Sequence, residues 1–290
     1  MRQLINALMS EKFQVSTRYL LVAAILTIGT STPVLAFDTL SVDRLNYSFA
    51  TYLGTGIYKA GDQNVQVYQI PLSYQLQAAD NENYGIKINV PLTIGYFGID
   101  TSDIIGDGLP DNVSTYSIVP GIEFTVPVSL NWQLSPFADY GFSTNNENGE
   151  TYTIYSYGIK SRYNFPINQY QLVLGNNLLY AKQKSDDGSN DSDFASFETG
   201  LDFRLPEFKF FNTHLADFSF YYVNFRYFDN LEFLRPANRP VDVTIQNEIG
   251  FTFGVRLQEK YRYLDIPRIG LGYRKGDGLS VFRIVLGMPF

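Results

Sequence analysis

The sequence predicts an all-β fold, a transmembrane antiparallel up-and-down β-barrel of about twelve strands. Apolar and polar residues alternate along many short segments, and no segment approaches the ~20 consecutive apolar residues that a spanning helix needs. The last stretch, LSVFRIVLGMPF at residues 279–290, has an apolar residue at every second position and no later segment to cover that face. We expect lipid to cover it.

The N-terminal 36 residues predict a cleaved secretory signal peptide. Arg2, Lys12 and Arg18 precede an apolar run at residues 19–28, and small residues then lead to a cleavage site after Ala36; Met9 is an alternative start. Residues 37–290 are then the barrel, with its first strand at residues 44–58. That strand begins so close to the cleavage site that we expect no passenger domain, periplasmic domain or plug helix ahead of the barrel.

The composition excludes several classes of function. The chain has 22 Lys and Arg against 29 Asp and Glu, and removal of the signal, which holds three basic residues and Glu11, makes the balance more acidic. A nucleic-acid partner is excluded because phosphate binding needs a basic surface. The chain has no cysteine, so disulfides and cysteine-ligated metals are excluded, and no cofactor is expected. Its 22 Tyr and 23 Phe suit strands and interfacial girdles.

The second and third predicted strands, at residues 68–76 and 86–96, form the clearest hairpin, with a turn at 79–82. In the simplest register Pro71 and Pro91 face each other. This conflicts with a closed barrel, because proline lacks the N–H that a strand ladder uses. A non-hydrogen-bonded site, a bulge or water in the lumen would relieve the conflict.

Nine further segments complete the predicted barrel: residues 116–126, 132–142, 155–165, 170–180, 197–205, 215–228, 243–257, 269–273 and the final stretch. The segment at 215–228 is apolar in both phases, which predicts a bulge near Tyr222. An even strand count places both termini on one side, which we expect to be periplasmic. Short turns near residues 81, 131 and 168 then lie on that side, and longer loops at 98–113, 181–193 and 229–242 lie opposite. Ten or fourteen strands remain compatible with the pattern.

Charged residues on the non-lipid face are the candidates for a pore lining. They are Arg44, Lys87, Glu123, Asp139, Lys160, Arg162, Glu198, Asp202, Arg204, Glu248, Arg256, Arg268, Arg274 and Arg283. They can line a water-filled pore with some anion preference. The preferred alternative is that they pair across the lumen and close or narrow it, as is common in small barrels.

The sequence shows little sign of metal or catalytic chemistry. Asp103, Asp107 and Asp111 have spacings like those of calcium loops, but Ile105 replaces a ligand, so a solvated acidic loop is preferred. The cluster of Asp186, Asp187, Asp191 and Asp193 is interpreted in the same way. His214 is the single histidine, and no serine stands beside it in a recognisable motif. We therefore predict no catalytic residue and no metal.

The end of the chain carries a family resemblance. Residues 268–274 (RIGLGYR), a turn at Gly276-Asp277-Gly278 and the closing VFRIVLGMPF resemble the end of bacterial outer-membrane β-barrels, and more narrowly of solitary, passenger-less autotransporter-type barrels of Gram-negative bacteria. In that class the barrel assembly machinery recognises a terminal aromatic residue and alternating apolar residues, here Phe282, Ile284, Leu286, Met288 and Phe290. The resemblance implies an outer-membrane location, with lipid and lipopolysaccharide as further partners. Typical autotransporters thread a helix through the pore, and we expect no preceding segment to supply one.

Three functional hypotheses follow. The first is a non-enzymatic outer-membrane barrel with a structural or surface role or a narrow pore. The second is a passive channel for small solutes, whose selectivity would depend on Arg256 or Arg283. The third is an outer-membrane lipid-modifying enzyme that would need His214.

Overall fold

The computed structural model describes residues 50–60, 63–80, 83–97, 115–146, 149–186, 188, 191–210, 214–233, 241–256 and 268–290. The segment predicted to be a signal peptide, Arg44 and the acidic residues Asp103, Asp107 and Asp111 lie outside the described residues. No helix within the described ranges is long and apolar enough to cross a membrane.

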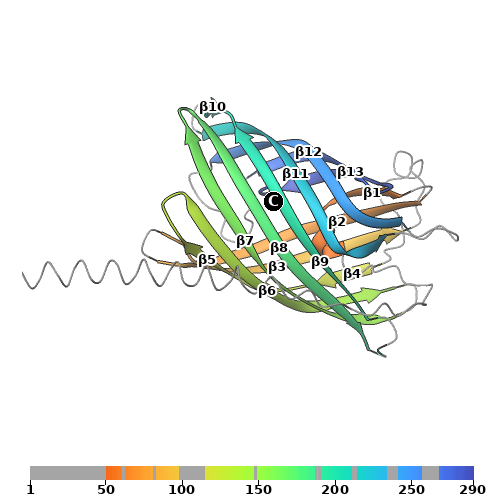
Figure 1. Cartoon of the computed structure of the whole chain (residues 1–290). Coiled ribbons are helices and arrows are strands. Elements are labelled where there is room, and N and C mark those ends of the chain that lie inside the picture. The colour runs from red at the N-terminus through yellow and green to blue at the C-terminus, as the bar shows by residue number, and fades with distance from the viewer. Residues whose placement is uncertain are drawn as a thin grey trace, which may run out of the picture. The chain divides into compact units, whose positions relative to one another are not determined.

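The described chain is almost entirely antiparallel sheet (Figure 1). Its strands are β1 (Gly56–Ala60), β2 (Gln63–Gln77), β3 (Gly85–Phe97), β4 (Thr115–Ile118), β5 (Gly121–Pro127), β6 (Trp132–Asn145), β7 (Thr151–Ile167), β8 (Tyr170–Ser185), β9 (Ser192–Arg204), β10 (Phe208–Phe210), β11 (His214–Phe233), β12 (Val241–Arg256), β13 (Arg268–Gly276) and β14 (Leu279–Leu286). Consecutive strands pair, and β1 pairs with β14 to close the barrel. Because β4 and β5 are two pieces of one spanning strand and β10 is a short addition beside β11, the barrel has twelve strands. The predicted fold class and strand count are confirmed.

Side chains alternate between an apolar outer face and a mixed inner face. On β14, Phe282 is 68% exposed whereas Val281 and Val285 are buried. Exposed large apolar residues occur around the barrel: Ile70, Tyr116, Ile118, Phe124, Tyr140, Phe142, Tyr157, Leu178, Leu201, Phe203, Phe218, Phe220, Ile249, Phe251, Ile269, Leu271, Phe282 and Ile284. This outer apolar belt is the period-two pattern that the sequence predicts.

The two prolines of the first hairpin do face each other, with Pro71 opposite Pro91. The ladder between β1 and β2 reaches only Val67, so Pro71 has no ladder partner on its other side. The ladders of β3 with β5 and with β4 end at Asn89 and begin again at Leu92, so Pro91 faces the break between β4 and β5. Neither proline therefore removes a donor that a neighbouring strand needs.

The predicted bulge near Tyr222 is wrong. The register of β11 with β12 is continuous from Leu215 to Arg226 and shifts only between Arg226 and Leu231. Both phases are apolar because Phe220 and Tyr222 point outward while Val223 and Phe225 are buried inside. On β12, Val243 is fully buried, and Thr244 and Ile245 after it are both exposed.

The predicted first strand is also wrong at its start. Residues 50–53 form a single helical turn, α2 (Ala50–Leu53), and β1 begins only at Gly56. α2 lies inside the barrel: Gln69 Nε2 donates to the Thr51 carbonyl at 2.7 Å, and the hydroxyls of Thr51 and Thr93 are 3.3 Å apart. A short helical segment before the barrel therefore does enter the lumen, contrary to the expectation from the sequence.

The end of the chain departs from the predicted final strand. β14 ends at Leu286, and Gly287 has φ +101°, a conformation that favours glycine. Residues 287–290, hereafter the tail, turn into the barrel, where the Phe290 ring lies against Gly175 and Gly200; Figure 1 marks the end of the chain. Met288 and Phe290 therefore do not share the outer face with Phe282 and Ile284.

The start of β1 and the end of β14 lie at one end of the barrel, since Gly56 pairs with Arg283. This turn end also holds the connections after β2, β5, β7, β9 and β12, including a two-residue turn at Asn168. The opposite loop end holds the connection between Phe97 and Thr115 and a two-residue turn in which Asp277 and Gly278 both have positive φ. At the turn end Trp132, the single tryptophan, donates from Nε1 to Ser161 Oγ at 3.0 Å.

Candidate functional site in the barrel lumen

The structure places the described charged candidates on the inner face. They are Lys87, Glu123, Asp139, Lys160, Arg162, Glu198, Asp202, Arg204, Glu248, Arg268, Arg274 and Arg283. Arg256 is described only by its backbone, which pairs with Leu215. Six of these twelve charges gather into two ion-pair clusters, each built from several strands.

The largest group, the Glu248 cluster, joins four strands. Glu248 on β12 is fully buried and accepts from Arg274 Nε on β13 at 2.7 Å and from Arg283 Nη1 on β14 at 3.2 Å. Tyr221 on β11 donates its hydroxyl to the same carboxylate at 2.7 Å. The Arg274 guanidinium lies 3.6 Å from the centre of the Phe225 ring. A buried charge is tolerated when it is paired and hydrogen-bonded in this way.

The second group, the Glu123 cluster, lies on β3, β5 and β7. Glu123 accepts from Lys160 Nζ at 2.7 Å and lies 3.2 Å from Lys87 Nζ. Lys160 also lies 5.0 Å from the centre of the Phe137 ring. The carboxylate is buried, but both lysine side chains keep partial exposure inside the lumen. The cluster is therefore hydrated on one side.

Smaller polar contacts complete the inner face. Arg204 Nε donates to Asp202 at 2.9 Å, and Ser156 donates to Asp139 at 2.6 Å. Arg268 lies 2.6 Å from Asp217 and donates to Thr252 Oγ1 at 2.6 Å.

The sequence analysis missed Tyr221, Phe225 and Asp217 as inner-face residues. The sequence does carry a sign of them, because residues 215–228 are apolar at both odd and even positions. The sequence analysis interprets this pattern as a bulge.

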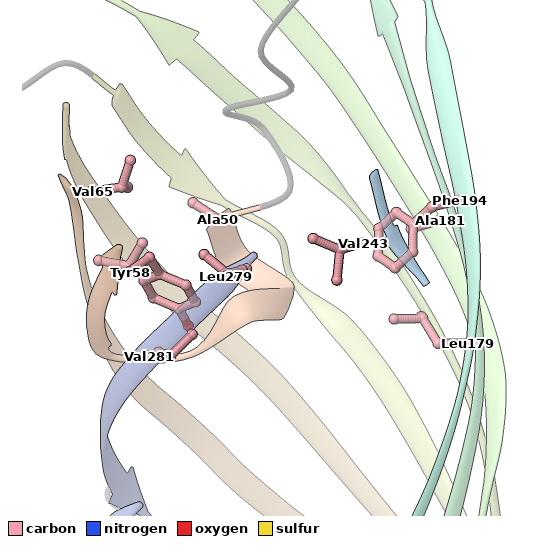
Figure 2. Close-up of a cluster of buried hydrophobic side chains, with 10 residues drawn as sticks. Ala50, Tyr58, Val65, Leu179, Ala181, Phe194, Val243, Leu279 and Val281 are labelled. Carbon is pink, nitrogen blue, oxygen red and sulfur yellow. The ribbon is translucent and has the colours of Figure 1, made fainter. Parts of the chain in front are cut away.

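Apolar side chains also fill part of the interior. The largest buried cluster joins β1, β2, β8, β9, β12 and β14 to α2, and Figure 2 shows Tyr58, Leu279 and Val281 beside α2. Tyr52 of α2 makes an edge-on contact with Phe194 of β9, with ring centroids 6.0 Å apart. Tyr58 donates its hydroxyl to the Gly54 carbonyl at 2.8 Å. α2 thus connects opposite parts of the barrel wall.

The tail occupies a notch in the wall. Gly175 and Gly200 pair on β8 and β9, and a Cβ atom on them would lie 2.0 and 2.2 Å from the Phe290 ring. Met288 Sδ lies 3.0 Å from Arg204 Nη2, and the Pro289 carbonyl lies 3.4 Å from Arg283 Nη2. Two facing glycines are needed there because any side chain would overlap the ring.

Two cavities border the tail. The first, of about 380 Å³, is lined by residues of β2, β3, β5, β6, β7 and β8 together with Met288 and Phe290. The second, of about 300 Å³, is lined by α2, Glu198, Arg274, Arg283 and Phe290. The lumen is therefore divided into small spaces by the chain itself.

The described residues also bear on the metal and histidine sites considered from the sequence. No group of three or more His, Asp or Glu side chains that could hold a metal occurs among the described residues. His214 opens β11, and its Nδ1 has no hydrogen-bond partner within the described chain. Asp191 instead accepts a hydrogen bond from the Ser185 backbone, and Asp193 accepts one from Tyr180.

The described strands define the class, a closed twelve-stranded antiparallel β-barrel whose lumen is partly filled by α2, the tail and inner-face side chains. No family model matches the chain, and no curated protein matches it. Among solved structures, the crystal structure of the β domain of the Bordetella autotransporter BrkA is similar, with a TM-score of 0.50 and 10% identity, covering 79% of this chain and 94% of that chain. At this identity the likeness shows a shared fold, that of an autotransporter β domain.

Proposed function

We propose that this chain is an integral β-barrel protein of a bacterial outer membrane. The residues of the barrel itself close its lumen. The protein has a structural or surface role without catalysis. The outer apolar belt supports membrane insertion. Soluble monomers rarely expose contiguous apolar patches above a few hundred Å². A belt present on every side of the barrel therefore requires a covering, and hydrocarbon provides it.

The observation that carries the closed lumen is that α2 and the tail both occupy it. Phe290 packs against the buried residues Tyr221, Val223, Phe225 and Val285, and Tyr52 of α2 contacts the opposite wall at Phe194. The ion-pair clusters fill further space between them. A barrel of this strand number is readily filled by side chains.

We further propose that the turn end faces the periplasm and the loop end faces lipopolysaccharide. Outer-membrane barrels commonly have short turns on the periplasmic side and longer loops on the outer side. Export through the predicted signal peptide, and recognition of Phe282, Ile284, Leu286, Met288 and Phe290 by the assembly machinery before folding, belong to the same proposal.

Planar-bilayer recording on the full-length protein tests the closed lumen. The unaltered protein should show no steady conductance steps. The double variant Met288→Ala, Phe290→Ala removes two side chains from the lumen and should produce steps. Ile284→Ala, which shortens an outer-face residue of the adjoining strand, is the matched control and should stay silent. Uniform, sustained steps from the unaltered protein would refute the closed lumen.

The second candidate is a passive channel for small solutes. The two cavities that border the tail favour it, because they leave about 380 and 300 Å³ of the barrel interior unfilled by side chains. In that case the unaltered protein conducts, and Arg283→Gln changes its ion selectivity.

A further inference from the structure

The first cavity, of about 380 Å³, carries an excess of positive charge. Lys87, Lys160 and Arg162 all border it, and the carboxylate of Glu123 is the acidic side chain among its lining residues. Asp202 on the neighbouring β9 is already paired with Arg204. Counting the main-chain carboxylate of Phe290 as well still leaves more positive than negative charge.

Arg162 is the group with unused binding capacity. Its hydrogen bond is a long one, from Nε to Asn164 Oδ1 at 3.4 Å. In the part of the chain that the structure describes, no Asp or Glu side chain lies within ion-pair distance of it. A guanidinium presents a planar fork of N–H donors that matches the two oxygens of a carboxylate or phosphate.

The strand register brings Arg162 and Lys160 to the same space. They are two residues apart on β7, where they pair with Gly175 and Asn177 of β8 and with Gln133 and Ser135 of β6. Gln69, Ser73, Asn89, Gln133 and Ser135 supply neutral hydrogen-bonding groups around the same cavity. The wall thus offers charged and neutral donors that face one cavity of about 380 Å³.

We propose that this cavity is a binding site for a small oxyanion, the phosphate or carboxylate group of a small solute. Its volume falls within the range of small-molecule sites, and low-dielectric walls strengthen the attraction between the cations and an anion. Arg162 contacts the oxyanion through its fork, and Lys160 provides a second charge while still paired with Glu123. The tail forms one wall of the site.

Titration calorimetry on the full-length protein in detergent tests the site, with inorganic phosphate and, separately, acetate added at constant ionic strength in chloride. We expect saturable binding of one or both, which identifies the preferred oxyanion. Arg162→Gln should weaken it roughly tenfold, the loss expected for one charge-assisted contact. Arg162→Lys, which keeps the charge without the fork, should weaken it less.

Arg226→Gln is the matched control, since Arg226 is exposed on the outer face of β11. It removes the same charge and should leave binding unchanged. If Arg162→Gln does not yield a folded barrel, Lys160→Gln serves as the second variant of the same cavity. Absence of saturable binding, or an equal loss in Arg226→Gln, would overturn the proposal. Binding does not require a closed lumen, so the conductance test and this test fail independently.

Discussion

Two ion-pair clusters of the lumen have the same balance of charge and different surroundings. In each, one glutamate lies between two cations from other strands. Glu248 and Arg274 have side-chain exposures of 0% and 3%, whereas Lys87 and Lys160 keep 26% and 43%. Arginine forks and a Tyr221 hydroxyl enclose the first carboxylate completely, and flexible lysines leave the second beside a cavity. The difference teaches that one cluster stabilises the wall and the other remains available to a ligand.

The largest effect expected from this comparison is that of Glu248→Gln. It removes the carboxylate that both guanidiniums contact, and loss of one partner of a buried ion pair costs about 3–5 kcal/mol. Glu123→Gln is the matched change in the other cluster and should cost about 1 kcal/mol or less, because water screens its lysines. Urea unfolding in micelles measures both free energies. Equal losses in the two variants would contradict the distinction.

An intermediate effect is expected from Gly175→Val, which moves the tail that lies between the two cavities. A Cβ at this position overlaps the Phe290 ring, so the ring must leave its notch and lose about 2 kcal/mol of apolar burial. The free energy of unfolding in urea measures the loss. Ala138→Val adds two methyl groups on the exposed outer face and should change little. An unchanged free energy in Gly175→Val would show that Phe290 is not bound in the notch.

The smallest effect on stability is expected at Asp277, whose carboxylate accepts hydrogen bonds from neutral donors and not from the cations that surround Glu248 and Glu123. Asp277 Oδ2 accepts from the backbone N–H of Ile245 at 2.7 Å and from the backbone and hydroxyl of Thr244. The Ile245 hydrogen bond, followed by those of Thr244, holds the pKa of Asp277 below its usual value of 3.8. Because the pKa of Asp277 is lower in the folded than in the unfolded state, its ionisation stabilises the folded state. This contribution is complete at pH values above the ordinary carboxyl pKa, and it is lost as the pH falls through the lowered pKa.

Asp277→Asn should therefore lower the free energy of unfolding at pH 7 by less than about 1 kcal/mol, because the turn is exposed to water. The difference between the variant and the unaltered protein should shrink as the pH falls below 3.8. Urea titrations at pH 7 and at acidic pH provide the check. A difference that stays constant over this range would show that ionisation of Asp277 does not stabilise the turn.

The fold could be predicted from the sequence because a period of two assigns each side chain to a face. This rule predicted the twelve strands and the facing prolines. The same rule failed where apolar residues continue to occupy every second position but the chain is not in a strand. Thr51 and Leu53 continue the period of two but belong to α2, and Met288 and Phe290 continue it beyond the bend at Gly287.

The lumenal site could be predicted only in part. The alternation along each strand assigns Glu248, Arg274 and Arg283 to the inner face. Whether their side chains meet depends on the register between neighbouring strands, which the sequence of one strand does not determine. The notch for Phe290 requires Gly175 and Gly200 to pair across β8 and β9, a contact that appears only once the register is known. The assumption that inner positions are polar also concealed Val223 and Phe225.

Trp132 has a practical consequence. As the single tryptophan of the chain, half-buried at the start of β6 at the turn end, it is the one indole that contributes to the intrinsic fluorescence of the protein. Its emission wavelength, and its quenching by lipids brominated at defined depths, therefore report on the bilayer contact of one rim of the barrel without any engineered label.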